Sequence, residues 1–413
     1  MTAGGTGYPS SAGSASSPSS YVPNPAAIRH GRVAGWLLGR DGILRRLDWW
    51  LILAALALSV VGGVLAWAAT WNIPQITGGN SRFFLERTSV NLLIGLVLAA
   101  VTTAFSYPML RAYIPVGFLL ALGGLVAVLS PLGATINGAH SWIVLPGGMS
   151  LQPVEFAKVG LIAILALWLG QSVEQDDSRD AYPRGRTVVV ALVLAAVPLA
   201  LVMLQPDLGS ALILGAATLG VLAVAGVRAR WIAGLVAAAA VVAVLAIRSG
   251  LLSAYQINRF VAFVNPAADP QGAGFNAQQA RIAIGNGGLW GQGLFQGYQT
   301  NGHFVPYQWT DFIFTVAGEE LGFIGAGAII AVLGLLFWRI YRIALGAEDL
   351  FGRVAAAGVL TWFAVQAFEN IGMALGITPV TGVPLPFVSY GGSSMFAAWV
   401  AVGLLENVHM RRE

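Results

Sequence analysis

The sequence predicts an all-α polytopic membrane protein with about ten transmembrane helices. Of its 413 residues, 57% are hydrophobic and only 10% are charged, and the mean hydropathy is +0.74. This balance is typical of a chain that crosses the bilayer several times. The apolar residues are also gathered into long segments, and a helix needs about 20 such residues to cross a hydrocarbon core of about 30 Å.

The chain begins with a polar region. Residues 1–28 are rich in Gly, Ser, Pro and Ala and contain no apolar run, which predicts a disordered tail and not a signal peptide. Five arginines then precede the first apolar segment: Arg29, Arg32, Arg40, Arg45 and Arg46. We expect residues 1–46 to form a disordered basic tail on the cytoplasmic side.

Ten apolar segments follow, and we expect residues 47–410 to form one membrane domain. The segments cover residues 48–71, 86–105, 108–130, 153–172, 187–204, 208–226, 230–247, 311–340, 353–376 and 393–409. A long polar stretch, residues 249–310, separates the seventh segment from the eighth and predicts a large loop between helices 7 and 8. Residues 411–413 follow the last segment.

The arginines predict the orientation of the domain. With a cytoplasmic N-terminus, sixteen of them lie inside and five outside, the five being Arg82, Arg87, Arg248, Arg259 and Arg281. Positive charge favours the cytoplasmic side of a membrane. Ten spans also return the C-terminus to that side, so we expect both termini to be cytoplasmic and the 249–310 loop to be extracellular.

Several classes of site are excluded or unsupported. The chain has no cysteine, which excludes disulfides, thiolate metal sites and cysteine nucleophiles. It has neither a Walker-type motif nor a dinucleotide-binding glycine motif. Because the arginines lie near the ends of spans, they indicate topology and the lipid bilayer as a partner, and no nucleic acid.

Ionisable residues inside the predicted spans are candidates for function. Each costs about 2.5 to 3.5 kcal/mol at the centre of the membrane. Glu155 and Lys158 stand three residues apart on one helix face, and Lys158 is the only lysine in the chain. A single ammonium among arginines suggests a geometric need in a site, although a buried structural ion pair explains it equally well. Asp207 either caps the sixth helix or lines the same cavity.

Asp311 lies where the long polar loop meets the apolar eighth segment. A carboxylate there is partly in water and partly against a low-dielectric wall, where its pKa and reactivity are easily tuned. One interpretation is a catalytic acid or base. The other is a helix cap, since Thr310 or Asp311 could accept from the first free N–H groups of the helix.

The 249–310 loop has features of an anion-binding surface. It carries Arg259 and Arg281, and arginine binds phosphate as a two-pronged donor. Its glycines, at positions 285, 287, 288, 291, 293 and 297, would let backbone N–H groups approach an anion, although a tight loop explains them nearly as well. Trp142, Trp290, Tyr298 and Trp309 could stack on sugar rings or simply lie at the membrane interface.

Taken together, residues 47–410 resemble the SEDS family (shape, elongation, division and sporulation) of bacterial membrane proteins. The matching motifs are GAHSWI (138–143), QPVEFAK (152–158), QPDLG (205–209), RF (259–260), NP (265–266), DP (269–270), GFN (274–276), QQ (278–279), IAIG (282–285), TDFIF (310–314), EELG (319–322) and SYGGSS (389–394). Residues 379–387 (PVTGVPLPF) are more similar to the elongation branch than to the division branch. Two departures occur: the acid and the histidine that relatives carry before the Thr-Asp pair are absent, and Ser141 replaces a usual cation.

The resemblance implies a peptidoglycan glycosyltransferase that polymerises lipid II on the outer face of the bacterial cytoplasmic membrane. It implies a class B penicillin-binding protein as partner, which cross-links the chains. Asp311 would be the catalytic base in an inverting attack that expels polyprenyl diphosphate. The residues expected to bind substrate are Lys158, Glu155, Trp142, Arg259, Arg281, Asp207, Gln152, Ser389 and Ser393. No protein metal site is expected, although a divalent cation, Mg or Mn, could help neutralise the diphosphate.

Two other functions compete with this one. A lipid II flippase would use the ionisable residues to line a path across the bilayer, but alternating access favours a site at the midplane and repeat symmetry. A non-catalytic scaffold would only recruit the penicillin-binding protein. Because the unusual residues gather on the outer side, where no nucleotide supplies energy, catalysis on a substrate that carries its own leaving group fits better.

Overall fold

The computed structural model describes residues 43–136, 139–145, 149–174, 183–249, 254–265 and 272–411. The predicted disorder of residues 1–28, and the loop motifs at 266 and 269–270, lie outside these residues. The chain divides into two units, Met1–Leu47 and Asp48–Glu413. In the first unit the described element is the short helix α2 (Ile43–Arg46).

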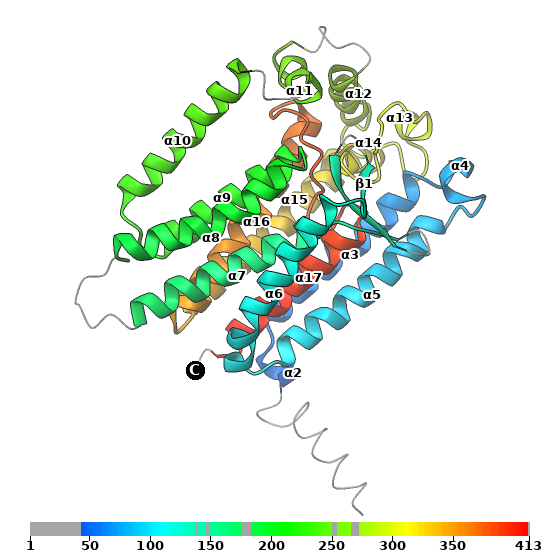
Figure 1. Ribbon diagram of the computed structural model, residues 1–413. Helices are drawn as coiled ribbons and strands as arrows, with labels where there is room; N and C mark the ends of the chain where they lie inside the picture. Colours follow the sequence, from blue (N-terminus) through cyan, green and yellow to red (C-terminus); the bar gives the residue numbers. More distant parts are fainter. Residues whose placement is uncertain are drawn as a thin grey trace, which may run out of the picture. The chain divides into compact units, whose positions relative to one another are not determined.

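The second unit is mostly helical, and ten of its helices match the ten predicted spans (Figure 1). These are α3 (Trp49–Ala68), α5 (Phe83–Ala104), α6 (Tyr107–Val128), α7 (Pro153–Glu174), α8 (Gly185–Met203), α9 (Leu208–Val224), α10 (Ala229–Arg248), α15 (Gly322–Gly346), α16 (Leu350–Leu375) and α17 (Gly392–His409). Among the described residues, eight helices are long and apolar enough to cross a membrane. The other two, α9 and α17, have 17 and 18 residues. The predicted multi-pass helical membrane fold is therefore confirmed.

Five short helices complete the helical part of this unit, and four of them belong to the predicted large loop or its edge. They are α4 (Pro74–Thr77), α11 (Ala254–Val264), α12 (Ala273–Asn286), α13 (Tyr298–Asn301) and α14 (Ile313–Glu320). The long loop is thus largely folded where it is described. Its helices gather near the end of the bundle where α14 begins (Figure 1).

The eighth span differs from the prediction, which placed one helix over residues 311–340. The structure has two helices, because the chain breaks at Gly322, whose φ is +68°. That left-handed conformation is open to glycine but costly for other residues. The crossing helix therefore begins at Gly322 and not at Asp311, and α14 is a separate buried helix that precedes it.

A small antiparallel sheet occupies the connection between α6 and α7, where the sequence indicated only a loop. Its strands are β1 (Gly133–Ile136), β2 (Ala139–Leu145) and β3 (Met149–Leu151), in the order β1-β2-β3. Ala134 pairs with Trp142 and Ile143 with Leu151. The sheet contacts α6, α7 and α17, and its strand β2 carries Trp142.

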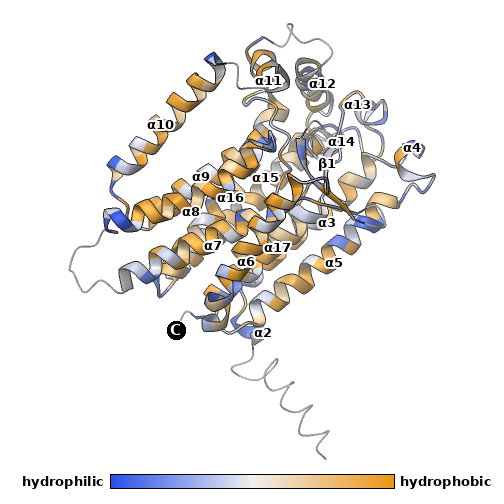
Figure 2. Cartoon of the chain, viewed as in Figure 1, coloured by the Kyte–Doolittle hydropathy of each residue, from blue (hydrophilic) through white to orange (hydrophobic). Residues whose placement is uncertain are grey.

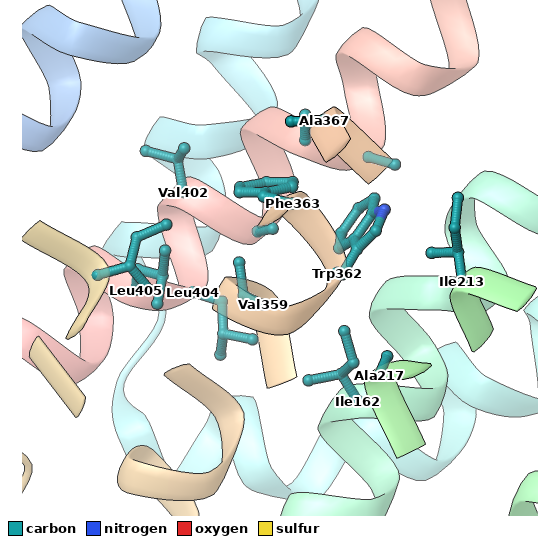
Figure 3. Close-up of a cluster of buried hydrophobic side chains, with 14 of the residues drawn as sticks. Ile162, Ile213, Ala217, Val359, Trp362, Phe363, Ala367, Val402, Leu404 and Leu405 are labelled. Carbon is teal, nitrogen blue, oxygen red and sulfur yellow. The ribbon is translucent and has the colours of Figure 1, made fainter. Parts of the chain in front are cut away.

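The core is centred on α16. Its side chains Trp362, Phe363 and Val359 lie among apolar residues of α7, α9 and α17, including Ile162 and Ile213 (Figure 3). Apolar residues also cover the outward surfaces of the helices, while polar residues concentrate at the helix ends (Figure 2). The α10 helix is the extreme case, since none of its crossing window is buried inside the protein. This distribution is what a bilayer solvent requires, because lipid satisfies apolar surfaces and not polar ones.

Candidate active site

Asp311 does not cap a helix. The N-cap position of α14 is Phe312, and no side chain there accepts a hydrogen bond from the first turn. The Thr310 hydroxyl instead donates to the Tyr307 carbonyl at 3.2 Å. The Asp311 side chain is half-buried and caps no helix, so its carboxylate is available to take part in a reaction.

The guanidinium of Arg259, on α11, lies beside this carboxylate. A Cβ placed on Gly382 would stand 3.3 Å from Asp311 Oδ2, and 3.7 and 3.9 Å from the two terminal nitrogens of Arg259. Arg259 Nη1 also donates to the Thr381 carbonyl at 2.9 Å. Gly382 has φ +76°, a left-handed conformation that favours glycine, and it lies beside both the carboxylate and the guanidinium.

The surroundings set the ionisation of Asp311. Burial raises the pKa of Asp311 to about 6. The Arg259 guanidinium and the Thr310 hydroxyl lower this pKa, and the Asp207 carboxylate raises it by a smaller amount. A carboxylate in this state is mostly ionised at neutral pH, yet basic enough to accept a proton usefully in a transition state.

Asp207 lies close to Asp311 because the α9 N-terminus packs on the same turn. It is the N-cap of α9, accepting from Ser210 N at 3.0 Å and from Ser210 Oγ at 2.8 Å. The next glycine, Gly209, approaches the Thr381 carbonyl so closely that a Cβ would lie 3.0 Å from it. The structure therefore gives Asp207 the capping role, and it also brings this residue to the site.

A cationic pocket adjoins Arg259. It encloses about 330 Å³ with its open mouth included, and it is lined by Arg259, Arg281, apolar side chains of α11 and α12, and the turn formed by Gly376 and residues 378–380. Arg281 is exposed and its Nε donates to the Ala277 carbonyl at 3.3 Å. Two arginines at one open pocket next to a base form a surface suited to a diphosphate.

Lys158 and Glu155 lie in a different environment, sealed inside the bundle. Each is 1% exposed, and Lys158 Nζ donates to Glu155 Oε1 at 2.7 Å and to Gln366 Oε1 at 3.0 Å. The Trp362 ring lies 5.6 Å from the same ammonium. The Gln366 amide in turn donates to the Pro384 carbonyl at 2.8 Å. The hydrogen bonds described for this pair lead through Gln366 to the turn at residues 381–384, which we call the site turn, as the structural interpretation expects.

The other predicted residues are engaged in backbone contacts. The Ser389 hydroxyl donates to the Thr310 carbonyl at 2.6 Å and accepts from Leu385 N at 2.7 Å, so it secures the chain just before Asp311. Ser393 Oγ accepts from Gln152 N at 2.9 Å, joining α17 to the start of α7. Trp142 lies on β2 and is not among the residues that line the pocket of Arg259 and Arg281, so the structure does not bring it together with them.

One glycine of the loop, Gly291, has a packing role. Gly291, with φ +81°, lies against the break between α14 and α15, where a Cβ would stand 2.2 Å from the Glu320 carbonyl oxygen. Backbone bonds complete the junction, with Gln292 N donating to the Glu319 carbonyl at 2.9 Å and Gly293 N to the Glu320 carbonyl at 3.0 Å. These N–H groups are therefore used by the protein and not held for an anion.

Glu319, inside the predicted span, is fully satisfied by the loop. Its carboxylate accepts from Gln299 N at 2.7 Å and from Thr300 N at 2.8 Å, at the start of α13. No group of three or more His, Asp or Glu residues that could hold a metal ion occurs in the described part of the chain. Sequence reasoning did not single out Gln366 and Asn370, two buried amides of α16 that donate hydrogen bonds to the site turn.

Comparison with known proteins agrees with this architecture. A family model described as a cell cycle protein, covering FtsW, RodA and SpoVE, matches residues 48–413. A Trichlorobacter lovleyi protein named "Probable peptidoglycan glycosyltransferase FtsW" is 38% identical over 368 residues, which covers 88% of this chain and 93% of that protein. The Escherichia coli K12 protein named peptidoglycan glycosyltransferase MrdB is 35% identical over 368 residues, covering 89% and 94%. A solved structure described as "Structural coordination of polymerization and crosslinking by a peptidoglycan synthase complex" matches with a TM-score of 0.73 and 31% identity, over 89% of this chain and 98% of the other.

Proposed function

The chain belongs to the SEDS family of FtsW, RodA and SpoVE proteins, and from that premise we propose that it is a peptidoglycan glycosyltransferase that polymerises lipid II during cell elongation. Relatives named as glycosyltransferases cover most of its length. The elongation role is supported by residues 379–387, the segment that contains the site turn. The distribution of arginines supports a reaction at the outer face of the bacterial cytoplasmic membrane, with both termini inside.

The observation that carries the proposal is the meeting of Asp311 and Arg259 around Gly382, beside an open pocket that also contains Arg281. The Asp311 carboxylate is half-buried and caps no helix, and the cations Arg259 and Arg281 lie on one side of it. Base and anion site thus adjoin, as a glycosyl transfer with an anionic leaving group requires.

The proposed reaction needs no external energy source. The 4-hydroxyl oxygen of the acceptor sugar forms a bond to the anomeric carbon of the donor, and Asp311 takes the hydroxyl proton. The bond from that carbon to the diphosphate oxygen breaks with inversion, and polyprenyl diphosphate leaves as an anion. Arg259 and Arg281 stabilise the departing charge, so no acid is needed to protonate it, unlike the leaving group of a glycosidase.

A divalent cation is compatible with these residues but is not required by them. Mg²⁺ is commonly bound by one or two carboxylates together with substrate phosphates, and Asp311 and Asp207 are close enough to influence each other electrostatically. Asp207 could therefore hold Mg or Mn against the diphosphate while Asp311 serves as the base, and the ion would supply additional charge neutralisation. The buried Lys158 and Glu155 would contribute through the position of the site turn.

The proposed partner is a class B penicillin-binding protein. The proposal is supported by the similarity to a chain from a peptidoglycan synthase complex described as coordinating polymerisation and crosslinking. A transpeptidase beside the outer end of the helices would receive each glycan strand as it forms.

The test is polymerisation of labelled lipid II by purified protein in detergent, with and without the partner. We expect polymer from the wild type, none from Asp311→Asn, and a loss on the order of a hundredfold in Asp311→Glu, since a displacement near 1 Å can cost that much in rate. Asn keeps the size of the side chain but cannot serve as a general base.

Three results would count against the proposal. Translocation of lipid II in vesicles without polymer in detergent would indicate a flippase. Partner binding without either activity would indicate a scaffold. Substantial polymerisation by Asp311→Asn would remove this residue as the base.

A further inference from the structure

Asn370 is a buried amide side chain that joins the backbone at Asp311 to the site turn. It lies near the outer end of α16 and is 0% exposed. Its Nδ2 donates to the backbone carbonyl of Asp311 at 2.7 Å and to that of Val383 at 2.8 Å. One side chain therefore links two segments that lie 72 residues apart in the sequence.

Each of the two segments contributes one part of the proposed active site. The first contains the Asp311 carboxylate, and the second contains Thr381, whose carbonyl holds Arg259 at 2.9 Å. Gln366, one helical turn earlier on α16, donates to the Pro384 carbonyl at 2.8 Å. The rigid face of α16 therefore fixes the turn at two successive carbonyls and fixes Asp311 through Asn370.

The choice of an amide fits this task. A primary amide nitrogen has two N–H groups, and each points to a different carbonyl. Carbonyls buried without a partner are costly, and the hydrogen bond from Asn370 is buried at Val383 and partly buried at Asp311. Neither segment can therefore leave Asn370 without losing a hydrogen bond that water replaces only in part.

We propose that Asn370 is a positioning residue for glycosyl transfer, which holds the Asp311 backbone and the 381–383 turn so that the carboxylate and the Arg259 guanidinium face the same point. The proposal rests on the proposed function, because it assigns Asn370 a role in placing the base. It concerns a residue that touches no substrate and acts only through the backbone of others.

Asn407 provides a matched control in the same chain. It is also a buried asparagine, 2% exposed, and its Nδ2 donates to backbone carbonyls, those of Thr102, Thr103 and Phe105, at 3.1, 3.2 and 2.7 Å. These contacts lie at the C-terminal end of α5, at the other end of the bundle. Substitution there removes the same kind of interaction without altering the site.

The experiment compares Asn370→Asp and Asn370→Ala with Asn407→Asp and Asn407→Ala, and with Asp311→Asn as the reference for lost chemistry. Each purified protein is assayed for lipid II polymerisation across pH, and its thermal unfolding is measured in the same detergent. We expect the Asn370 variants to lose 10- to 100-fold in kcat with KM changed less than threefold, consistent with displacement of a base by up to about 1 Å. Their acidic limb, which is the fall in rate as the pH is lowered, should also move to higher pH, because the Asp311 carboxylate is no longer held against Arg259.

The Asn407 variants should unfold at a lower temperature yet keep a kcat within threefold of the wild type and an unchanged pH limb. The proposal is overturned if Asn370 variants keep wild-type kcat while Asp311→Asn is inactive. It is also overturned if both asparagines lose activity alike with no movement of the limb, or if neither Asn370 variant folds. If Asp311→Asn itself is active, the proposed function fails, which is a separate result.

Discussion

Asp311 combines partial burial with a neighbouring guanidinium, and these two features have opposite effects on its pKa. Burial dominates and raises the pKa to about 6. A general base must be ionised before it can accept a proton. We therefore expect the rate of polymerisation to fall as the pH drops through about 6, and to be level above about 7.

The Arg259→Gln variant tests the cause of that limb. Removing the cation removes the influence that lowers the Asp311 pKa, so the limb should move to higher pH. The maximal rate should also fall, since the same side chain lines the pocket that we propose for the leaving group. The measurement is the rate against pH for both proteins at saturating lipid II. A limb near pH 4 in the wild type, or one that Arg259→Gln leaves in place, would contradict the assignment.

Lys158 presents a different case, because it is sealed from solvent with its ammonium on Glu155 and Gln366. Removing one partner of a buried ion pair costs about 3 to 5 kcal/mol, whereas replacing both partners is often nearly neutral. Lys158→Met should therefore lower stability by about that amount, and the double variant Glu155→Gln with Lys158→Met should recover most of it. We expect polymerising activity to return with the stability, measured by thermal unfolding and polymer yield.

The same pair of variants can show a direct role for the ammonium. If the double variant unfolds like the wild type but makes no polymer, Lys158 must act on the substrate or its charge, and the burial seen here belongs to one state of the enzyme. A double variant as unstable as Lys158→Met would show instead that the pair is not the source of the loss.

Residue chemistry made part of the site predictable. Asp311, Arg259 and Arg281 stand out in the sequence because charges are rare in this chain and these lie at the edge of, or in, one polar loop. Gln366 and Asn370 were missed because amides carry no charge and lie inside an apolar span. Their spacing of four residues on one helix face is the signal that could have identified them.

At the scale of elements, the junction between the glycine loop and the α14–α15 break depends on two backbones in close approach. A Cβ at Gly291 would meet the Glu320 carbonyl at 2.2 Å, in a left-handed conformation. Gly291→Ala should therefore destabilise the protein by at least about 2 kcal/mol, from backbone strain and steric overlap. It should also reduce activity, because α14 follows Asp311 directly.

A control for this substitution lies six residues earlier. Gly285 is helical, in α12, and a Cβ there meets nothing within 4 Å. Gly285→Ala should leave the unfolding temperature unchanged or raise it slightly, since alanine favours a helix by about 1 kcal/mol over glycine. Equal unfolding temperatures for the two alanine variants would show that the loop does not need its close approach.

Elements were predictable wherever one physical requirement fixed them. Ten spans follow from apolar length, and Asp207 as the cap of α9 follows from its place before a helix. The break at Gly322 was not predicted, since it depends on contact with Gly291, which is distant in sequence. The sheet formed by β1, β2 and β3 was not predicted, because its strands are short and no hydrophobic period reveals them.

At the scale of the whole molecule, interactions within the second unit sort the helix ends into two groups. Asp48 pairs with Arg339 and its N–H donates to Glu406, and Tyr107 donates to Asp349 at 2.6 Å. These contacts collect the ends that the arginine count places in the cytoplasm. Asp311, Arg259 and the turn at Gly382 lie at the other end of the bundle, where α15 begins and α16 ends, so the orientation of the chain decides on which side the chemistry occurs.

Cysteine labelling tests that orientation directly, because the chain has no native cysteine. Gln296 is exposed and polar in the loop near α13, and Ala229 is exposed at the start of α10, beyond the far end of α9. In intact cells, Gln296→Cys should react with a membrane-impermeant maleimide, whereas Ala229→Cys should react only after the membrane is permeabilised. The reason is the excess of arginine on the Ala229 side, which favours the cytoplasm. Labelling of Ala229→Cys alone in intact cells would invert the domain, place Asp311 beside the cytoplasm, and remove the argument that the substrate must carry its own leaving group.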